Sequence, residues 1–325
     1  MNNLNELEKL ITRNYDNTGA IVVTKKGKKV YEYYQDGCTS QSPFHVFSVT
    51  KSVMGLLIGI AFEQGYISDI HTFVLDFFPD YEVKKREHTI QKITLYDLLT
   101  MTAPYKYKSA PYTKFFTSED WVKSSLDLLG GKDKIGEFRY APVIGPDIFS
   151  GIIRNTTGRS VLDFANKNLF EPLDIKVPGD IKFYDKKGQM EFYKSKTVRG
   201  WVSDPQGTHT AGWGLILTIE DMSKLAKLML QEGEFNGKQL VPKEWIRECT
   251  ETKSEWKTPI FKRKYGYLWW IIDEDEHSYA ALGDGGNVIY VNPKKELTVA
   301  IGSYFKPRVA DRMKLIKETL EPLFG

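Results

Sequence analysis

The chain has 325 residues, in which 45 Lys and Arg stand against 42 Asp and Glu and leave a formal charge of +3. Hydrophobic residues make up 41% of the sequence and charged residues 27%, proportions that exclude the disordered and collagen-like classes of protein. The small net charge gives no reason to expect a nucleic acid as partner.

The first part of the chain predicts a helix, a hairpin and a second, longer helix. Leucines spaced three apart near the N-terminus mark one face of a short amphipathic helix. Strand-like runs over residues 19–24 and 29–34 are joined by glycine and lysine residues that suit a hairpin turn. The apolar residues 48–64 predict a long helix, with Gly65 as its C-cap.

The rest of the chain changes from helical to strand-like patterns. Residues 66–207 mix turns with short predicted helices, at 94–101, 118–129 and 146–156. Two further helices are predicted over residues 219–230 and 309–320. Between them, short apolar or alternating runs separated by turns are typical of an antiparallel meander, at residues 266–272, 278–282, 287–291 and 297–304.

Together these elements predict an α/β (α+β) fold. Two early strands and about four late ones would form one antiparallel sheet, flanked by the terminal helices. Residues 1–65 and 208–325 would make up this sheet domain, and residues 66–207 would be a mainly helical inserted domain.

Several features bear on metals, membranes and location in the cell. Cys38 and Cys249 lie far apart, neither they nor the histidines show metal-ligand spacing, and we expect reduced thiols and no cofactor. The N-terminus lacks the basic start and apolar segment of a secretory signal. The longest apolar stretch, residues 53–62, is too short to cross a bilayer. We therefore expect a cytoplasmic protein without membrane contact, and its oligomeric state stays open.

The strongest local signal for chemistry is a Ser-x-x-Lys motif at the start of the long helix. Ser48 and Lys51 lie three residues apart, so both side chains lie on one helical face. A serine hydroxyl needs a base, and a lysine whose pKa is lowered by burial can act as one. The alternative interpretation is an N-capping serine beside an exposed lysine.

Ordered sequence blocks resemble the serine beta-lactamase superfamily, in its class C, penicillin-binding-protein and esterase branch. The resemblance covers nearly the whole chain and is greatest to intracellular serine hydrolases related to 6-aminohexanoate-dimer hydrolases. It implies a beta-lactamase/transpeptidase-like fold. The blocks that carry it are residues 47–52, 93–102, 137–140, 149–160, 170–173, 204–214, 218–222 and 266–270.

The resemblance also implies roles for three side chains. Ser48 would be the acylated nucleophile, Lys51 its hydrogen-bonded partner, and Tyr140 the group that passes a proton to the leaving group. A phenol has an ordinary pKa near 10, so Tyr140 would act as a base only if a cation such as Lys51 stabilised its phenolate. Packing in the core is the alternative role for this tyrosine.

Two departures from the family pattern stand out. Tyr140 is followed by Ala141 and Pro142, so the asparagine that commonly contacts the substrate is missing. The third family motif, Lys-Thr-Gly or His-x-Gly, appears as Asp-Gly-Gly. Asp284 would repel an anionic substrate group, unless it only shapes a turn. The substrate-binding candidates in this motif are Asp284, Gly285 and Gly286.

Backbone and side-chain groups complete the predicted site. The N–H groups of Ser48 and Asn287 would form an oxyanion hole, because the glycines let the backbone approach the acyl group. His209 and Trp213 are further candidates for substrate contact, with an incidental loop position and core packing as the alternatives.

The sequence favours a serine hydrolase that cleaves a small ester or amide through an acyl-enzyme. Two other hypotheses remain. One is a beta-lactamase or D,D-peptidase-like enzyme, which the missing export signal and the carboxylate at Asp284 disfavour. The other is a non-catalytic binding or regulatory relative, which the lost asparagine favours and the retained Ser48, Lys51 and Tyr140 disfavour.

Overall fold

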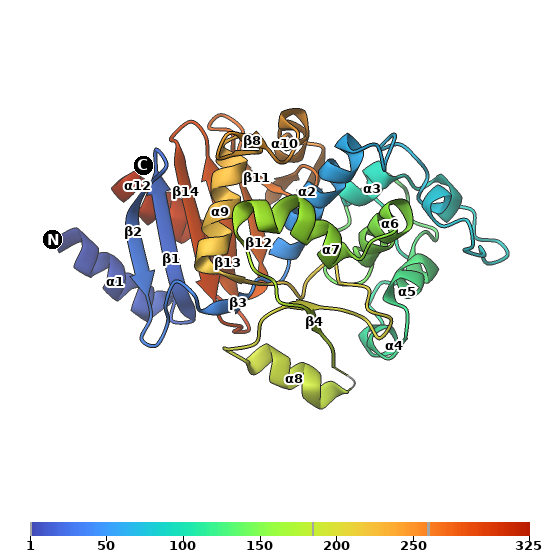
Figure 1. Cartoon of the computed structure of the whole chain (residues 1–325), viewed down its shortest axis with the longest axis horizontal. Helices are drawn as coiled ribbons and strands as arrows, with labels where there is room; N and C mark the ends of the chain where they lie inside the picture. Colours follow the sequence, from blue (N-terminus) through green and yellow to red (C-terminus); the bar gives the residue numbers. More distant parts are fainter. Residues whose placement is uncertain (1, 184, 259–260) are drawn as a thin grey trace.

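A computed structural model of the chain describes residues 2–183, 185–258 and 261–325 (Figure 1). Its centre is an eight-stranded antiparallel sheet in the order β2-β1-β14-β13-β12-β11-β10-β9. The predicted fold class is therefore confirmed. The strands are β1 (Thr18–Lys25), β2 (Lys28–Tyr34), β9 (Ser254–Lys257), β10 (Lys262–Tyr265), β11 (Trp270–Asp273), β12 (Ser278–Gly283), β13 (Asn287–Asn292) and β14 (Leu297–Ser303).

Strands from the two ends of the chain meet near one edge of this sheet. Strand β1 pairs with β14, and Ile21 lies opposite Ile301. Successive residues of a strand point to opposite faces of the sheet, so both faces must be covered. Accordingly Val22 belongs to the large core on one face, and Val23 belongs to a second core on the other.

The second core lies under the terminal helices. Helix α1 (Asn2–Asn14) and the C-terminal helices pack on the same face of the sheet, and the N- and C-termini lie near one another at one end of the molecule (Figure 1). The C-terminal helix predicted over residues 309–320 is divided, because a π-helical turn, Ile316–Leu320, separates α11 (Arg312–Leu315) from α12 (Glu321–Phe324).

The large core lies between the other face of the sheet and the helical part of the molecule. Helix α9 (Ile219–Leu230) crosses this face in front of β13 and β14, and α2 (Val49–Glu63) packs beside β12 (Figure 1). Helix α2 is buried on all sides, as its almost continuous apolar sequence requires. Gly65 follows its end with a positive φ of 75°.

Most of the remaining helices form the helical part, while α8 (Lys186–Lys194) lies at the lower edge and α10 (Lys243–Thr250) at the top in Figure 1. Several begin at the capping residue that the sequence offers: Thr94 and Asp97 form a capping box, as Thr218 and Asp221 do at α9. These helices are α3 (Leu95–Leu99), α4 (Tyr112–Phe116), α5 (Trp121–Leu128), α6 (Asp147–Thr157), α7 (Val161–Ala165), α8 (Lys186–Lys194) and α10 (Lys243–Thr250). Short strand pairs join β3 (Pro43–His45) to β6 (Ile216–Thr218), β4 (Asp180–Ile181) to β5 (Trp201–Val202), and β7 (Glu234–Phe235) to β8 (Lys238–Gln239).

The structure differs from the sequence prediction in several segments. The edge strand β9 and its neighbour β10 were not predicted, because they are largely exposed, rich in charged residues and without apolar alternation. Helices α8 and α10 were not predicted either. The strand predicted over residues 266–272 begins only at Trp270, because Leu268 adopts a positive φ of 61°.

No helix in the described ranges is long and apolar enough to cross a membrane. The division into a sheet domain (1–65 and 208–325) and an inserted domain (66–207) stays a prediction.

Candidate active site

Ser48 occupies the last position before helix α2. Its side chain makes no capping hydrogen bond, although serine is a favoured N-cap residue. Phe47, directly before it, has a φ of 46°, a left-handed conformation that costs a bulky residue about 1–3 kcal/mol. The backbone therefore turns sharply just before the helix and leaves the Ser48 hydroxyl partly exposed and uncommitted to the helix.

Lys51 lies one helical turn further on, and its side chain is 1% exposed. Its Nζ lies 3.0 Å from Ser48 Oγ and 2.7 Å from each of the carbonyl oxygens of Pro142 and Gly212. Burial lowers the pKa of Lys51 from 10.5 to about 7, although the charges of Asp284 and Asp147 act in the opposite direction. The amine is thus buried, oriented by two carbonyls and close to its neutral form near pH 7.

Tyr140 lies on the other side of the Ser48 hydroxyl. The two side chains share a hydrogen bond, and Lys51 Nζ lies 5.1 Å from the centre of the tyrosine ring. Trp270 packs against this ring at 5.5 Å between centroids. Burial and the charge of Asp284 raise the pKa of Tyr140 above its ordinary value, which outweighs the bond from Ser48. Tyr140 is therefore a neutral phenol at physiological pH, and this argues against the phenolate considered from sequence.

Asp284, Gly285 and Gly286 form a 3₁₀ turn between β12 and β13. Both glycines have positive φ values, 76° and 92°. The side chain of Asn17 holds this turn, because its Nδ2 donates to the carbonyls of Gly285 and Tyr304 at 2.7 and 2.6 Å. The turn is thus fixed between the strand ends, and exposed Asp284 lies at the mouth of the cleft that also contains Ser48.

Asn287 begins strand β13 and is fully buried. Its side-chain amide donates to the carbonyls of Asp284 and His45, and its Oδ1 accepts the N–H of Ser303. These bonds fix the strand directly after the Asp-Gly-Gly turn. The role of its backbone N–H in an oxyanion hole stays a prediction.

A cleft of about 650 Å³ opens beside Ser48. Its lining is mainly apolar and aromatic, and its charged side chains are Asp284 on one side and two lysines from the end of α8 and the residues after it. The lining residues are Phe47, Ser48, Pro142, Val143, Met190, Tyr193, Lys194, Ser195, Lys196, Trp213, Asp284, Tyr304 and Phe305.

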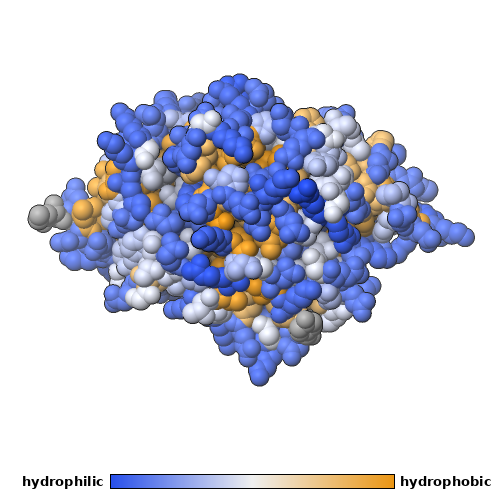
Figure 2. Space-filling model, viewed as in Figure 1, coloured by the Kyte–Doolittle hydropathy of each residue, from blue (hydrophilic) through white to orange (hydrophobic). Residues whose placement is uncertain are grey.

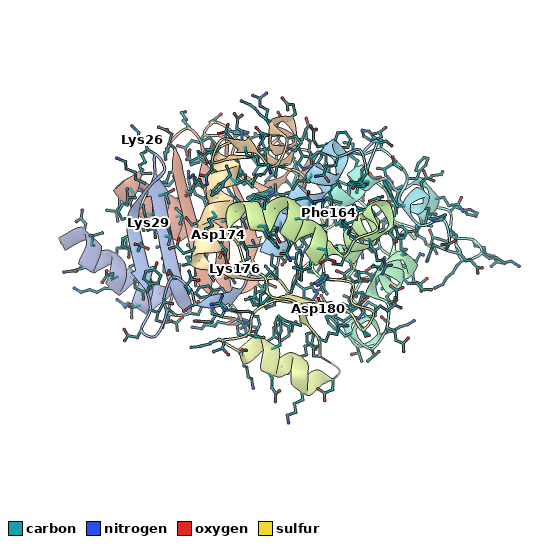
Figure 3. The ribbon with its side chains drawn as sticks, viewed as in Figure 1. Lys26, Lys29, Phe164, Asp174, Lys176 and Asp180 are labelled. Atoms are coloured by element: carbon teal, nitrogen blue, oxygen red, sulfur yellow. The ribbon has the colours of Figure 1, made fainter. Side chains whose placement is uncertain are left out.

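The structure separates the last two candidate residues. Trp213 lines the cleft and packs against His45 and Phe192. His209 is buried outside the cleft lining, where its Nε2 lies 2.7 Å from Asp180 Oδ1. Asp180 is labelled on β4 in Figure 3. His209 therefore connects two backbone segments and is not brought to Ser48.

Some residues of the site were not predicted from the sequence. The carbonyl of Pro142 binds Lys51, although its side chain offers no donor. Met190 and Tyr193 reach the cleft from α8, a segment that carries no recognisable motif. Asp147, at the start of α6, is a buried carboxyl group whose charge acts on Lys51. Its position seven residues after Tyr140 was a signal in the sequence, because aspartate is rare in the interior of an apolar block.

Groups of three or more potential metal ligands are absent from the described residues. The face shown in Figure 2 is mainly hydrophilic, with apolar side chains near its centre.

Comparison with known proteins places this geometry in a wider context. A family model described as beta-lactamase matches residues 7–320. An uncharacterized protein of Alkalihalophilus pseudofirmus is 27% identical over 241 residues, which cover 71% of this chain and 61% of that protein. The chain thus spans less than two thirds of that relative. The 6-aminohexanoate-dimer hydrolase of Paenarthrobacter ureafaciens is 20% identical, over 87% of this chain and 71% of the enzyme.

Solved structures of the same fold include enzymes of several activities. A 6-aminohexanoate-dimer hydrolase homologue from Bacillus anthracis superposes with a TM-score of 0.75 at 20% identity, over 98% of this chain and 81% of that one. A family VIII carboxylesterase gives 0.72 at 13% identity, over 98% and 96%. A D-stereospecific amidohydrolase from Streptomyces gives 0.71 at 16% identity, over 96% and 97%.

Proposed function

This chain belongs to the beta-lactamase family, and on that premise we propose that it is a serine hydrolase that cleaves a small ester or amide through a covalent acyl-enzyme on Ser48. The observation that carries the proposal is the 3.0 Å contact between Ser48 Oγ and the buried Nζ of Lys51. An exposed lysine beside a capping serine, the alternative considered from sequence, would have neither the burial nor the free hydroxyl.

Lys51 acts as the general base in this proposal. A neutral amine has two N–H donors and one lone pair. The carbonyls of Pro142 and Gly212 accept the two N–H bonds, so the lone pair points toward Ser48 Oγ. Lys51 takes the Ser48 proton while Oγ attacks the substrate carbonyl carbon, and the N–H groups of Ser48 and Asn287 stabilise the resulting oxyanion.

Tyr140 acts as the acid in the next step. It is a neutral phenol bonded to Ser48, so it can donate its proton to the leaving oxygen or nitrogen and recover one from Lys51. The acyl group then remains on Ser48 Oγ. Water attacks this ester with the same base and releases the acid, which restores the serine.

The cleft supports a substrate with an apolar or aromatic acyl group. The cleft has a volume of about 650 Å³, which is in the range that binds small ligands. Its aromatic lining includes Phe47, Tyr193, Trp213 and Phe305. One observation favours a second candidate, a penicillin-recognising enzyme: Lys194 and Lys196 line the same cleft and could pair with a substrate carboxylate. The carboxylate of Asp284 lines the same cleft and would repel a substrate carboxylate, which disfavours this second candidate.

A fluorophosphonate probe tests the proposed function. Intact mass should show one covalent addition, and peptide mapping should locate it on Ser48. Addition to another serine would refute the proposal. Failure to label, under conditions that label related hydrolases, would favour the hypothesis of a non-catalytic relative.

The rate of acylation should depend on pH through Lys51. Because its pKa is lowered to about 7, the amine is neutral above that pH and protonated below it. We expect the rate constant for fluorophosphonate addition to be half-maximal near pH 7 and to fall about tenfold per unit below pH 6. Tyr140 stays protonated throughout and adds no second transition. A rate independent of pH between 5 and 9, with the fold intact by circular dichroism, would contradict Lys51 as the base.

Asp284 should select against anionic substrates. A carboxylate at the mouth of the cleft repels a like charge by on the order of one to a few kcal/mol if it is partly shielded. We expect Asp284→Asn to raise kcat/KM for an anionic ester about three- to tenfold relative to its neutral analogue, and added salt to narrow the difference. The matched variant Lys196→Gln should have the opposite effect. Equal changes for both esters would show that Asp284 does not select substrates by charge.

A further inference from the structure

Asp147 is a buried carboxyl group that the proposed reaction does not use directly. It begins helix α6 and is 1% exposed. Its Oδ1 accepts the N–H of Ala211 at 2.8 Å, and the N–H of Gly212 adds a second attraction. Within the part of the chain that the structure describes, its Oδ2 is buried without a direct hydrogen-bond donor. A buried carboxylate oxygen without a donor destabilises the fold, so its presence calls for an explanation.

The segment that Asp147 holds through its N–H groups ends at Gly212, whose carbonyl orients Lys51. Gly212 offers its carbonyl to Lys51 Nζ at 2.7 Å, while the amide side of the same segment faces the Asp147 carboxylate. Gly212 is also confined sterically, because a Cβ there would lie 3.2 Å from the ring of Pro146 and 3.3 Å from the carbonyl of Pro142. Asp147 and the two carbonyls around Lys51 therefore form one rigid group.

We propose that Asp147 is a positioning residue: its carboxylate holds the Ala211–Gly212 segment, which fixes the Gly212 carbonyl against Lys51, and it adds negative charge beside the amine. The inference rests on the proposed function, since it concerns the base of that reaction. It assigns two separable effects to one carboxylate: hydrogen bonding sets where the amine lies, and charge favours its protonated form.

The surrounding charges support this assignment. The charges acting on Lys51 are those of Asp284 and, with the smaller effect, Asp147, and both raise its pKa against the effect of burial. Burial, the largest effect, and the charge of Asp204 raise the pKa of Asp147 to about 7, although the N–H groups of Ala211 and Gly212 and the charge of Lys51 lower it. The negative charge of Asp147 is therefore partly lost in the pH range in which Lys51 gains its proton. The N-terminus of α6 also favours the ionised form.

Two substitutions separate the two effects. Asp147→Asn keeps an acceptor for the Ala211 N–H but removes the charge, so Lys51 should lose its proton at lower pH. We expect the acidic limb of the fluorophosphonate rate to move to lower pH by less than about one unit, because Asp147 is itself partly protonated near pH 7, and the variant to be about twofold faster than the parent at pH 6 relative to its own plateau. Asp147→Glu keeps the charge but displaces it. The acidic limb of the pH–rate profile should therefore stay at the same pH, and the maximal labelling rate at high pH should fall about ten- to a hundredfold.

Asp221→Asn is the matched control. Asp221 is another buried carboxyl group that accepts a backbone N–H, from Thr218 at 2.9 Å, but it lies in the capping box of α9. Its substitution should lower the melting temperature without moving the pH limb.

The outcomes distinguish this inference from the proposed function. If the parent protein is not labelled at Ser48, the proposed function fails. If the parent is labelled and the profiles of Asp147→Asn and the parent superimpose, the charge role of Asp147 is refuted. If Asp147→Glu retains the full plateau rate, its positioning role is refuted, and this holds even where the asparagine variant does not fold.

Discussion

Replacing Ser48 with alanine is expected to remove hydrolysis of esters and amides almost entirely, by about four orders of magnitude or more. Without the hydroxyl there is no atom to carry the acyl group, and the neighbouring base then has no proton to remove. Covalent addition of a fluorophosphonate should disappear in the same variant. A discontinuous ester-hydrolysis assay measures the loss of turnover, and intact mass spectrometry independently measures the loss of covalent labelling.

Ser52→Ala provides the control for this result. Ser52 lies on the same helix one turn after Ser48, and its hydroxyl donates to the carbonyl of Leu268 at 2.7 Å. It is buried and committed to that bond, so its loss should cost some stability and leave labelling intact. If labelling survived in Ser48→Ala and vanished in Ser52→Ala, the nucleophile would be Ser52 and not Ser48.

The second large effect is expected at Lys51. Lys51→Ala should lower hydrolysis by roughly two to four orders of magnitude, the usual range for a general base. Lys51→Arg is the more informative change, because a guanidinium keeps the positive charge but stays protonated at every working pH. We expect Lys51→Arg to be as inactive as Lys51→Ala. The measurement is the single-turnover rate of acylation above pH 8.

An active arginine variant would change the mechanism. It would show that Lys51 contributes a positive charge and not a lone pair. Tyr140, or a water molecule, would then have to accept the Ser48 proton. Circular dichroism of each variant is needed beside the kinetics, since Lys51→Ala removes the donor to the buried carbonyls of Pro142 and Gly212 and Lys51→Arg places a larger donor against them.

Much of the fold was predictable because the sequence repeats local signals that the structure uses. Short apolar runs marked β1, β13 and β14, and helical patterns marked α3 and α9. The edge strand β9 and its neighbour β10 gave no such signal, because largely exposed strands tolerate charged residues. Their pairing depends on the neighbouring strand, which a local pattern does not contain.

The site was predictable to a lesser extent. Ser48, Lys51 and Tyr140 belong to sequence blocks, and the structure brings the three together. The state of Tyr140 did not follow from the blocks, since its neutral form results from burial beside Trp270 and from the charge of Asp284. His209 lies in a block too, yet it pairs with Asp180, from a segment with no motif. Contacts between segments that are distant in sequence determine the protonation state of Tyr140 and the position of His209, and a local sequence pattern does not contain such contacts.

The pairing of β1 with β14 has a consequence for how the chain acquires its structure during synthesis. The N-terminal hairpin leaves the ribosome first, but its inner strand must wait for residues 297–303 before it gains its neighbour. Until then an apolar strand edge stays uncovered, and contacts this distant in sequence form slowly. The sheet can therefore close only after β14 has been synthesised, and nascent chains truncated before β14 should be prone to aggregate.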